Sequence, residues 1–389
     1  MKISNIDKFP LMLPAKKQGW TEDEFVWPSQ TPSVIIRINT DKGISGVGEA
    51  TSQVWYLGET QEHMLKLIEL FEQRLIGEDP TNMSRIHGIM DRTASGGAPT
   101  SRAAFSAIDM AVFDIIGKVQ QRPVYEVLGG AYRTKLELLT NLYHKSPQSM
   151  AEACKKYVDK GFRGLKVKVG DILLNKGWSP RNFNEEIDKL LAALEVVPNE
   201  IYVDADANQA WKSPKLTVNT VQKRLNGFTN LSIEQPLQYF NLSGHSYVRK
   251  SIDCPVILDE SVLSPEIMIE IVKSEAADRI VMKLNRVGGF WPARKIIDIA
   301  EASAIGISVD TNPFTKIGDT ALCHLAATIK DPYPVDAEGH ISFIERFDPD
   351  PFPGGVEIKA GYAILPDAPG LGIELDEKEL NGFAGSIES

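Results

Sequence analysis

The feature that most constrains the fold of this chain is a regular alternation of apolar runs with amphipathic segments from about residue 136 onward. Seven strand-like runs follow one another at intervals of about 24 to 36 residues, and several precede segments of helical period. The runs begin near Leu136, Leu165, Ile201, Leu231, Val256, Ile280 and Ile307. The clearest helical segments are Met150 to Lys160, Glu185 to Leu194 and Ile267 to Ser274. Strands that alternate with helices predict βαβ units and a parallel sheet.

Seven such units favour a closed TIM-type barrel over an open sheet. An open, doubly wound sheet is the alternative, and it normally carries a GxGxxG or Walker-type loop after its first strand. Neither motif occurs in the sequence. We therefore predict an α/β fold with a TIM-type (β/α)7β barrel.

The segments on either side of the barrel have a different pattern. Before residue 130, two short strands at Ser33 to Thr40 and Ile44 to Ala50 predict a hairpin, and Gln61 to Leu75 and Ser101 to Lys118 predict helices. After Phe347 a connector rich in proline and glycine leads to two short strand-like pieces. We expect an N-terminal α+β segment at 1–130, the barrel at 131–345 and a C-terminal tail at 346–389.

Composition excludes several classes of function. The net charge of −10 disfavours nucleic acid as a partner, because phosphates are repelled. The N-terminus lacks the apolar core of a signal peptide, and no apolar run is long enough for a membrane span. The three cysteines form no CxxC pair, which is typical of a reducing compartment. We expect a soluble, cytoplasmic protein with no membrane or nucleic-acid partner.

Ionisable residues collect where six consecutive predicted strands end, which is the edge at which TIM barrels carry their chemistry. The strand ends read Lys166-Val167-Lys168, Asp204-Ala205-Asp206-Ala207-Asn208, Ile233-Glu234-Gln235-Pro236, Leu258-Asp259-Glu260-Ser261, Met282-Lys283-Leu284-Asn285-Arg286 and Val309-Asp310-Thr311-Asn312. One acid from each of three successive strands is a set of oxygen ligands for a hard cation, with Mg²⁺ preferred. The alternative for any single residue is a helix cap or a salt bridge on the rim.

The flanking lysines suit the removal of a proton next to a carboxylate. Such a proton is weakly acidic because its loss creates a dianion, and a divalent cation on the carboxylate offsets that charge. A nearby cation also lowers the pKa of a lysine toward the value that a general base needs. Lys168 and Lys283 belong to strands on opposite sides of the three acidic strands, so they would face the substrate carbon from opposite directions.

Several motifs in this order and spacing resemble one known family. They are Lys166-Val167-Lys168, Asp206-Ala207-Asn208-Gln209, Ile233-Glu234-Gln235-Pro236, Asp259-Glu260-Ser261 and Lys283-Leu284-Asn285-Arg286-Val287-Gly288-Gly289. Across nearly its whole length the chain resembles the mandelate racemase/muconate lactonizing enzyme family of the enolase superfamily, in its muconate lactonizing branch. In such sites a lysine or histidine base is paired with Mg²⁺ to stabilise an enediolate.

The resemblance implies a role for individual residues. Asp206, Glu234 and Asp259 would bind Mg²⁺, Lys168 and Lys283 would form the acid/base pair, and Lys166 would help neutralise the substrate carboxylate. The N-terminal segment and the C-terminal tail would together form one α+β capping domain over the barrel mouth. Substrate contacts are expected from Asn208 and from the cap segments Gly19 to Ser29 and Ser52 to Gly58, including Trp27 and Tyr56.

One position departs from the mandelate-racemase pattern, in which a histidine follows the seventh strand. This chain has Asp310 there and Lys283 in place of the supporting aspartate, so the His-Asp branch is disfavoured. Asp310 would either pair with a cationic nitrogen of the substrate or tie down the following turn. Glu338 is a similar substrate-binding candidate, and His144 at the end of the first strand is another.

Four functional hypotheses follow. Racemisation or epimerisation of an amino-acid or proline-type carboxylate leads, because one lysine removes the proton and the other returns it to the far face. Dehydration of a hydroxy acid or sugar acid is next, and muconate-type cycloisomerisation is third. The hypothesis of a different class is a non-catalytic metal-binding barrel. Family resemblance also suggests a homo-oligomer.

Overall fold

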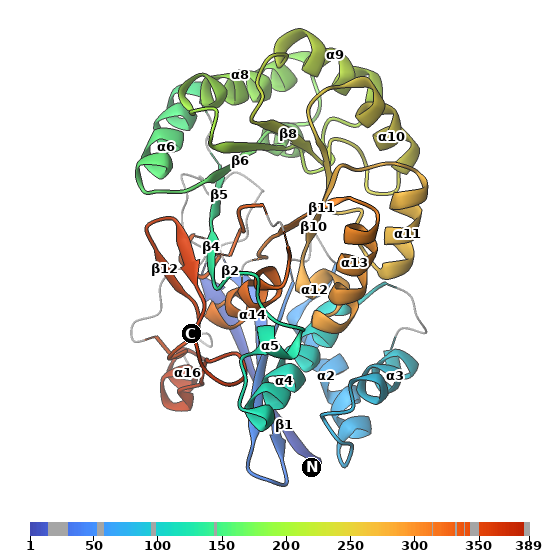
Figure 1. Cartoon of the computed structure of the whole chain (residues 1–389), viewed down its shortest axis with the longest axis vertical. Coiled ribbons are helices and arrows are strands. Elements are labelled where there is room, and N and C mark those ends of the chain that lie inside the picture. Colours follow the sequence, from blue (N-terminus) through green and yellow to red (C-terminus); the bar gives the residue numbers. More distant parts are fainter. Residues whose placement is uncertain are drawn as a thin grey trace.

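The computed structural model describes the chain in nine stretches, which are residues 1–14, 30–52, 58–94, 99–143, 146–312, 314–330, 333–337, 339–342 and 350–384. Figure 1 shows a ring of strands enclosed by helices, and a smaller part that contains the antiparallel strands β1 and β2 and the helices α2, α3 and α4. The N-terminus and the helix α16 (Glu377–Ala384), which contacts β1, lie beside this smaller part (Figure 1).

Seven parallel strands form the wall of the barrel and pair in chain order. They are β5 (Leu139–Leu142), β6 (Gly164–Lys168), β7 (Tyr202–Asp206), β8 (Leu231–Glu234), β9 (Val256–Leu258), β10 (Arg279–Met282) and β11 (Gly306–Val309). On β6 the apolar Leu165 and Val167 alternate with Lys166 and Lys168. Since successive side chains point to opposite faces, the lysines share the barrel interior while Leu165 and Val167 join the core beneath the helices.

The barrel is closed by two residues that take the place of an eighth strand. Leu138 and Val335 form a parallel bridge on one side, and Asp310 and Asp336 form another on the other side. The backbone N–H of Leu139 donates to the carbonyl of Val335 over 3.0 Å. The prediction of a closed TIM-type barrel is therefore confirmed.

Helices follow the barrel strands and cover the outside of the ring (Figure 1). They are α6 (Pro147–Asp159), α7 (Asp171–Lys176), α8 (Pro180–Val196), α9 (Pro214–Arg224), α10 (Leu242–Ser251), α11 (Pro265–Lys273), α12 (Leu284–Val287), α13 (Phe290–Ala302), α14 (Lys316–Ala327) and α15 (Gly339–Ser342). Four of them begin with the same Ser-Pro pair, in which the serine hydroxyl caps the first turn and proline occupies the first helical position. Three of these begin two to five residues before the start predicted from hydrophobic period alone.

The smaller part contains an antiparallel sheet in the order β1-β2-β3, packed against helices. Its elements are β1 (Ile3–Pro14), β2 (Gln30–Thr40), β3 (Ser45–Thr51), α2 (Gln61–Leu75), α3 (Met83–Ala94), α4 (Arg102–Gln120) and α5 (Val124–Val127). All side chains from Ala103 to Gly117 on α4 are buried. A Cβ atom at Gly48 of β3 would lie 2.0 Å from the carbonyl oxygen of Ala107, so only glycine allows the sheet to approach this helix so closely.

The run predicted to start near Leu136 divides into two strands. β4 (Lys135–Glu137) pairs with β13 (Tyr362–Ile364), which pairs in turn with β12 (Glu357–Lys359). Only β5, which follows it, belongs to the barrel. The C-terminal tail therefore folds back onto the entrance to the barrel, and it ends in α16 (Glu377–Ala384).

Two buried aspartates on α4 join the parts of the molecule. Asp109 accepts hydrogen bonds from the backbone N–H groups of Phe290, at 2.5 Å, and Trp291, at 3.2 Å, and so caps α13 of the barrel. Gly289 precedes this helix with φ +104, and a Cβ there would lie 2.3 Å from the Asp109 carboxyl group. Asp114 accepts from the N–H groups of Val47 at 3.0 Å and of Leu371, in the tail, at 2.8 Å.

A third buried acid makes the same kind of contact from β3. The Glu49 carboxylate accepts from the N–H groups of Thr315 and Gly318 at 2.8 and 3.0 Å, and so caps α14. An acid from the smaller part thus satisfies the first turn of each of two barrel helices, which fixes how the two parts meet.

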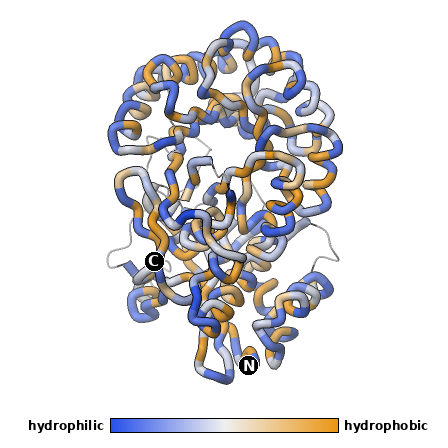
Figure 2. Tube along the Cα trace, viewed as in Figure 1, coloured by the Kyte–Doolittle hydropathy of each residue, from blue (hydrophilic) through white to orange (hydrophobic). Residues whose placement is uncertain are grey.

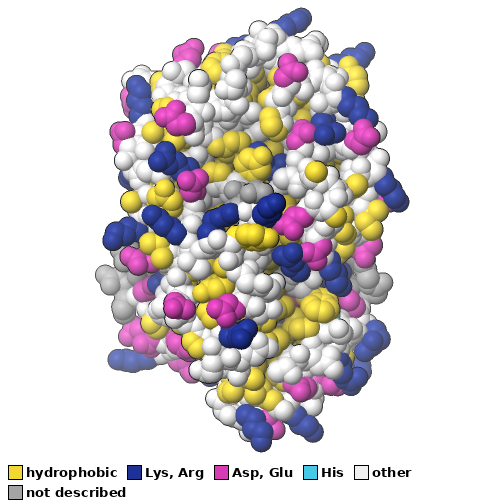
Figure 3. All heavy atoms as spheres, viewed as in Figure 1, with side chains coloured by type: hydrophobic (Ala, Val, Ile, Leu, Met, Phe, Trp, Pro, Cys, Tyr) yellow, Lys and Arg dark blue, Asp and Glu magenta, His cyan; other side chains and the backbone are white. Residues whose placement is uncertain are grey.

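Hydrophilic and hydrophobic stretches alternate along the outer helices in Figure 2, as amphipathic helices over a core require. On the face shown in Figure 3, acidic and basic side chains are interspersed. In the described part of the chain, no helix is both long enough and apolar enough to cross a membrane.

Candidate active site

The barrel brings the predicted site residues together at one edge. Lys168, Asp206 and Glu234 are direct neighbours in register across β6, β7 and β8. Asp259 directly follows β9, Lys283 directly follows β10, and both side chains are buried. Parallel strands place their C-terminal ends at the same edge, and this is why residues far apart in the sequence meet here.

Each of the two lysines predicted to act as acid and base binds one outer member of the acidic set. The Nζ atom of Lys168 forms an ion pair with Asp206 and lies 3.4 Å from the amide oxygen of Asn208. The Nζ atom of Lys283 lies 2.8 Å from Asp259 Oδ2. Because the strands of the two acids lie on either side of β8, the two lysines flank the acidic set from opposite sides.

Lys166 occupies the centre of the charged cluster that these lysines and acids form at the strand ends. Its Nζ atom lies 2.7 and 2.8 Å from the two carboxylate oxygens of Glu234 and 2.6 Å from Asp310 Oδ2. Asp204, one layer deeper in the barrel, is 3.7 Å away. Asp310 is therefore engaged by Lys166 and is only 2% exposed.

Arg286 completes the charge set on the side of Lys283, a role that the sequence motifs containing it did not predict. Its guanidinium lies 2.5 Å from Asp259 Oδ1 and donates to the carbonyls of Val262 and Val281, at 2.9 Å each. The signal available in the sequence was the three-residue spacing from Lys283, which places both residues at the first turn of α12.

Two short turns hold the ends of β7 and β8. Asn208 and Gln235 adopt left-handed backbone conformations, with φ of 40 and 38. The N–H of Asn208 donates to Asp206 Oδ1 at 2.9 Å. The side-chain oxygen of Gln235 accepts from the N–H of Asp259 at 2.9 Å. These turns therefore orient Asp206 and Asp259. The Asn208 side-chain amide lies between Lys168 and Glu260.

The charges at these strand ends shift one another's protonation. Burial acts to lower the pKa of Lys166, but the carboxylates of Asp310 and Glu234 outweigh it and hold that pKa well above its ordinary value. Lys168 follows the same rule, with Asp206 as the main opposing charge. Both lysines are therefore held in the protonated form in this arrangement.

The pKa values of the acids shift in different directions, depending on which charged groups lie next to each acid. Burial would raise the pKa of Asp259, but Arg286 and Lys283 hold it well below its usual range. Burial and the neighbouring Asp204 carboxylate raise the pKa of Glu234 well above its ordinary value. Burial, with the nearby Asp259 charge, also raises the pKa of Glu260 to about 7. These opposed shifts are typical of functional sites.

The donor set fits a divalent cation by its charge. The described strand ends contain seven buried carboxyl groups and four buried cationic groups, namely Asp204, Asp206, Glu234, Asp259, Glu260, Asp310 and Asp336 against Lys166, Lys168, Lys283 and Arg286. The excess of acids over cations suits the binding of a divalent ion. Within the described ranges, however, no three His, Cys, Asp or Glu side chains are grouped around one point, because the predicted ligands each bind a lysine.

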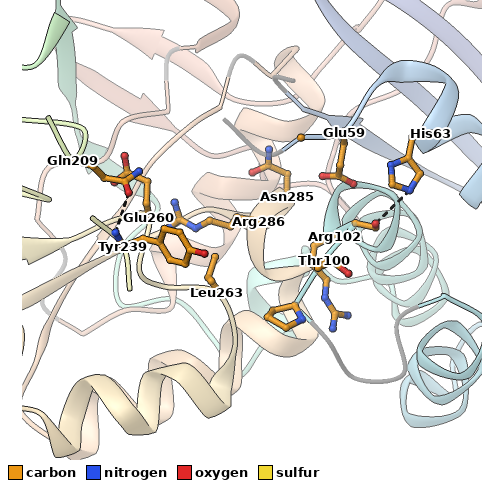
Figure 4. A pocket seen from close by; sticks show the side chains of 13 residues that line it. Glu59, His63, Thr100, Arg102, Gln209, Tyr239, Glu260, Leu263, Asn285 and Arg286 are labelled. Carbon is orange, nitrogen blue, oxygen red and sulfur yellow. Dashed lines mark hydrogen bonds between the residues drawn. The ribbon is translucent and has the colours of Figure 1, made fainter. Parts of the chain in front are cut away.

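A cavity of about 520 Å³ lies beside the cluster, at the junction of the two parts (Figure 4). Glu59 and Arg102 line it from the smaller part, and Tyr239, Glu260 and Arg286 line it from the barrel. Burial raises the pKa of Glu59 to about 7. The cavity thus offers both acidic and cationic groups, next to the acids that end the strands.

Four candidates from the sequence, Trp27, Tyr56, His144 and Glu338, lie outside the described residues. The predicted cap segment Gly19 to Ser29 also lies outside the described residues, and so does Ser52 to Gly58 except for its two end residues. Tyr143, which the sequence did not single out, lies with its ring 5.5 Å from the Lys168 Nζ atom.

Comparison with known proteins agrees with this geometry. Residues 26–129 match the family model of the mandelate racemase/muconate lactonizing enzyme N-terminal domain, and residues 149–379 match that of the enolase C-terminal domain-like family. The chain is 32% identical to an N-succinyl-L-Arg/Lys racemase of Bacillus cereus, over 98% of this chain and 97% of that protein.

Two other relatives are similar over most of their length. A hydrophobic dipeptide epimerase of Enterococcus faecalis is 34% identical over 88% of this chain and 91% of that protein. The solved structure of the E. faecalis dipeptide epimerase complexed with Mg and L-Leu-L-Tyr has a TM-score of 0.85 at 33% identity, covering 96% of this chain and all of that one. A cis-3-hydroxy-L-proline dehydratase of Roseibium aggregatum is 27% identical over 96% of each. The chain belongs to the mandelate racemase/muconate lactonizing enzyme family of the enolase superfamily and is an isomerase or lyase.

Proposed function

We propose that this protein is a racemase or epimerase, which removes and returns the proton on the carbon α to the carboxylate of an amino-acid derivative or dipeptide. The observation that carries the proposal is the placement of Lys168 and Lys283, which bind Asp206 and Asp259 on opposite flanks of the acidic set. Inversion needs one group to take the proton from one face and a second group to supply it to the other. The racemase and epimerase relatives support the same class of reaction.

In this proposal each charged residue has one task. Lys168 and Lys283 exchange protons with the two faces of the substrate carbon, and Lys166 faces the carboxylate. Asp206, Glu234 and Asp259 would hold Mg²⁺, whose charge would offset the negative charge that develops on the substrate carboxylate. A lysine whose carboxylate partner is shared with a cation loses part of the attraction that raises its pKa, so it can act as a base.

The substrate class follows from the cavity and from the relatives. Arg102 and Arg286 suit a second carboxylate or an acyl oxygen, whereas Glu59 and Glu260 suit a basic side chain. N-succinyl-lysine and N-succinyl-arginine carry both kinds of group, and a dipeptide carries an acyl oxygen and a cationic amino terminus. Of the two alternatives for Asp310, we favour the structural one, because its carboxylate is buried against Lys166. Asn208 lies beside Lys168 and is proposed as a substrate contact.

The test is proton exchange followed by NMR in D₂O with Mg²⁺. The probes are the L and D forms of N-succinyl-lysine and N-succinyl-arginine, L-Leu-L-Tyr with L-Leu-D-Tyr, and cis-3-hydroxy-L-proline. We expect deuterium at the α-carbon and conversion of each stereoisomer into the other. Lys168→Ala and Lys283→Ala should each abolish inversion, and each should spare exchange of the stereoisomer whose proton faces the remaining lysine.

Other outcomes would redirect the proposal. Loss of water from cis-3-hydroxy-L-proline without inversion of the other probes would favour the dehydratase alternative, for which the Roseibium relative is the supporting observation. Equal exchange by the parent and by Lys168→Ala would contradict the role of that lysine. No exchange with any probe, from protein that binds Mg²⁺, would favour a non-catalytic barrel. Homo-oligomer formation and a cytoplasmic location stay predictions, and sedimentation would test the first.

A further inference from the structure

Buried side chains from two other elements hold the backbone that leaves β6 after Lys168. The Nζ atom of Lys189, on α8, donates to the carbonyl oxygen of Lys168 over 3.3 Å. The indole N–H of Trp211 donates to the next carbonyl, that of Val169, over 3.0 Å. Glu186, also on α8, accepts from the N–H of Ile172 at the start of α7. The strand end is thus bound on the outer side of the barrel, behind the Lys168 side chain.

The Lys189–Glu186 pair is costly for a purely structural element. Lys189 is 1% exposed and Glu186 is fully buried, and their charged atoms lie 2.6 Å apart. Desolvation of two charges offsets most of their attraction, so apolar residues of similar volume often give equal or greater stability. The ammonium group of Lys189 does what an apolar side chain cannot, because it donates to the strand-end carbonyl of Lys168 while Glu186 balances its charge.

We propose that Lys189, held by Glu186, is a positioning residue for Lys168. The inference rests on the proposed function, in which Lys168 exchanges a proton with one face of the substrate carbon. The hydrogen bond to the Lys168 carbonyl fixes the peptide plane and therefore the direction in which the Lys168 side chain enters the barrel. A base that is misdirected by about 1 Å loses up to about 100-fold in rate.

The second lysine is held in a different way. The carbonyl of Lys283 accepts from the backbone N–H groups of Arg286 and Val287, at 3.1 and 3.2 Å, within the first turn of α12. Loss of the Lys189 ammonium should therefore impair the face served by Lys168 and spare the face served by Lys283. General destabilisation would affect both faces alike.

The experiment measures exchange at the α-carbon from each face in D₂O with Mg²⁺, by NMR. The probes are N-succinyl-L-lysine with N-succinyl-D-lysine, and L-Leu-L-Tyr with L-Leu-D-Tyr. Lys168→Ala first identifies the stereoisomer that Lys168 deprotonates, as the one whose exchange is lost. In Lys189→Met we expect the kcat for exchange of that stereoisomer to fall about 10- to 100-fold with KM little changed. Exchange of the other stereoisomer should stay within about twofold of the parent.

Further variants separate positioning from folding. Lys189→Arg keeps a cationic donor and should restore most of the lost rate. The Lys189→Met/Glu186→Gln double variant removes the unpaired buried charge and should show the same one-face defect if Lys189→Met alone folds poorly. Lys118→Met removes the lysine of another largely buried pair, with Asp114 at 2.9 Å in α4, and should leave the ratio of the two exchange rates unchanged.

Each result decides between two ideas. Exchange rates in Lys189→Met that match those of the parent at both faces, or that fall by the same factor at both faces, would overturn the positioning role. Either result would leave the two-lysine reaction in place. Failure of the unaltered protein to exchange either probe pair, or undiminished exchange in Lys168→Ala, would count against the proposed function, and the positioning role would fall with it.

Discussion

At the scale of single residues, Lys166 lies within 4 Å of three buried carboxylates, more than either of the other two strand-end lysines. It is the shared partner of Glu234 and Asp310, and Asp204 lies within 4 Å of it. Carboxylates at this depth are tolerated only when a cation compensates for lost hydration. Lys166 therefore has a structural task that is separate from any contact with substrate.

Lys166→Met should lower the free energy of unfolding by about 3 to 5 kcal/mol at neutral pH, because it leaves buried carboxylates without their cation. Urea denaturation followed by circular dichroism measures this. The double variant Lys166→Met/Asp310→Asn removes one of the stranded charges and should recover part of the loss. A single variant as stable as the parent would show that these acids are neutral or solvated.

At the scale of secondary-structure elements, side chains of the smaller part cap helices of the barrel and so hold the two parts together. Asp109 of α4 caps α13 and also lies 2.7 Å from the Nε2 atom of His87. Ser213 caps α9 from within its own segment, through an N–H at 3.3 Å. The first cap joins the two parts of the molecule, whereas the second is local.

Asp109→Ala should therefore lower the free energy of unfolding by about 3 kcal/mol. It removes hydrogen bonds to a carboxylate at a buried helix start and leaves His87 without its acceptor. Ser213→Ala, the control, should cost about 1 kcal/mol. Thermal and urea unfolding of both variants give the comparison. If the two variants lose the same stability, the cap across the parts contributes no more than a local one.

The element α14 introduces a pH dependence through His324. Its Nδ1 atom accepts from the N–H of Tyr125 and its Nε2 lies 3.1 Å from the carbonyl of Leu371. Burial lowers the pKa of His324 from 6.5 to about 4. As the pH falls below 6.5 the unfolded chain takes up this proton first, so the stability present above pH 6.5 is lost progressively toward pH 4.

Because of this histidine, the free energy of unfolding of the parent should fall by about 2 kcal/mol when the pH is lowered from 8 to 5. His324→Gln should lose less stability than the parent over the same interval, because glutamine does not titrate. Urea denaturation at the two pH values measures it, and the difference at pH 8 isolates the change in packing. Parallel losses in the two proteins would contradict the assignment.

At the scale of the whole molecule, the excess of buried acid predicts that Mg²⁺ stabilises the fold. Mg²⁺ at about 100 times its Kd should add about 2.7 kcal/mol to the free energy of unfolding. Asp206→Asn and Asp259→Asn should abolish the increase, while Asp188→Asn, at an exposed acid on α8 that pairs with Arg224, should keep it. Thermal unfolding with EDTA and with Mg²⁺ is the measurement. An unchanged midpoint in the parent would argue against a metal at these acids.

Much of the molecular plan could be predicted before any coordinates. The alternation of strands and helices predicted the closed barrel because βαβ units of this length and number have few other solutions. The two C-terminal strand pieces and the helix at Gln61–Leu75 were also predicted, since both depend on local patterns. The Ser-Pro helix starts were present in the sequence as well, but hydrophobic period does not report them.

The candidate site could be predicted only as a set of residues at one edge. Lys166, Lys168, Asp206, Glu234, Asp259 and Lys283 do meet at the strand ends, because strand order alone brings them there. That they serve as ligands and bases stays a prediction. Which lysine binds which acid could not be read from the chain, since it depends on register and on the turns at Asn208 and Gln235.

The sequence by itself determined the fold class, the strand ends at which charge collects, and the two lysines on either flank of the acids, because periodicity and strand order are local or topological properties. Only the tertiary structure decided that Val335 and Asp336 close the barrel, that Arg286 reaches Asp259, and that Lys189 binds the carbonyl of Lys168. Those contacts join residues on different elements, so they depend on how each helix is rotated and how deeply it packs, and no local pattern records either quantity.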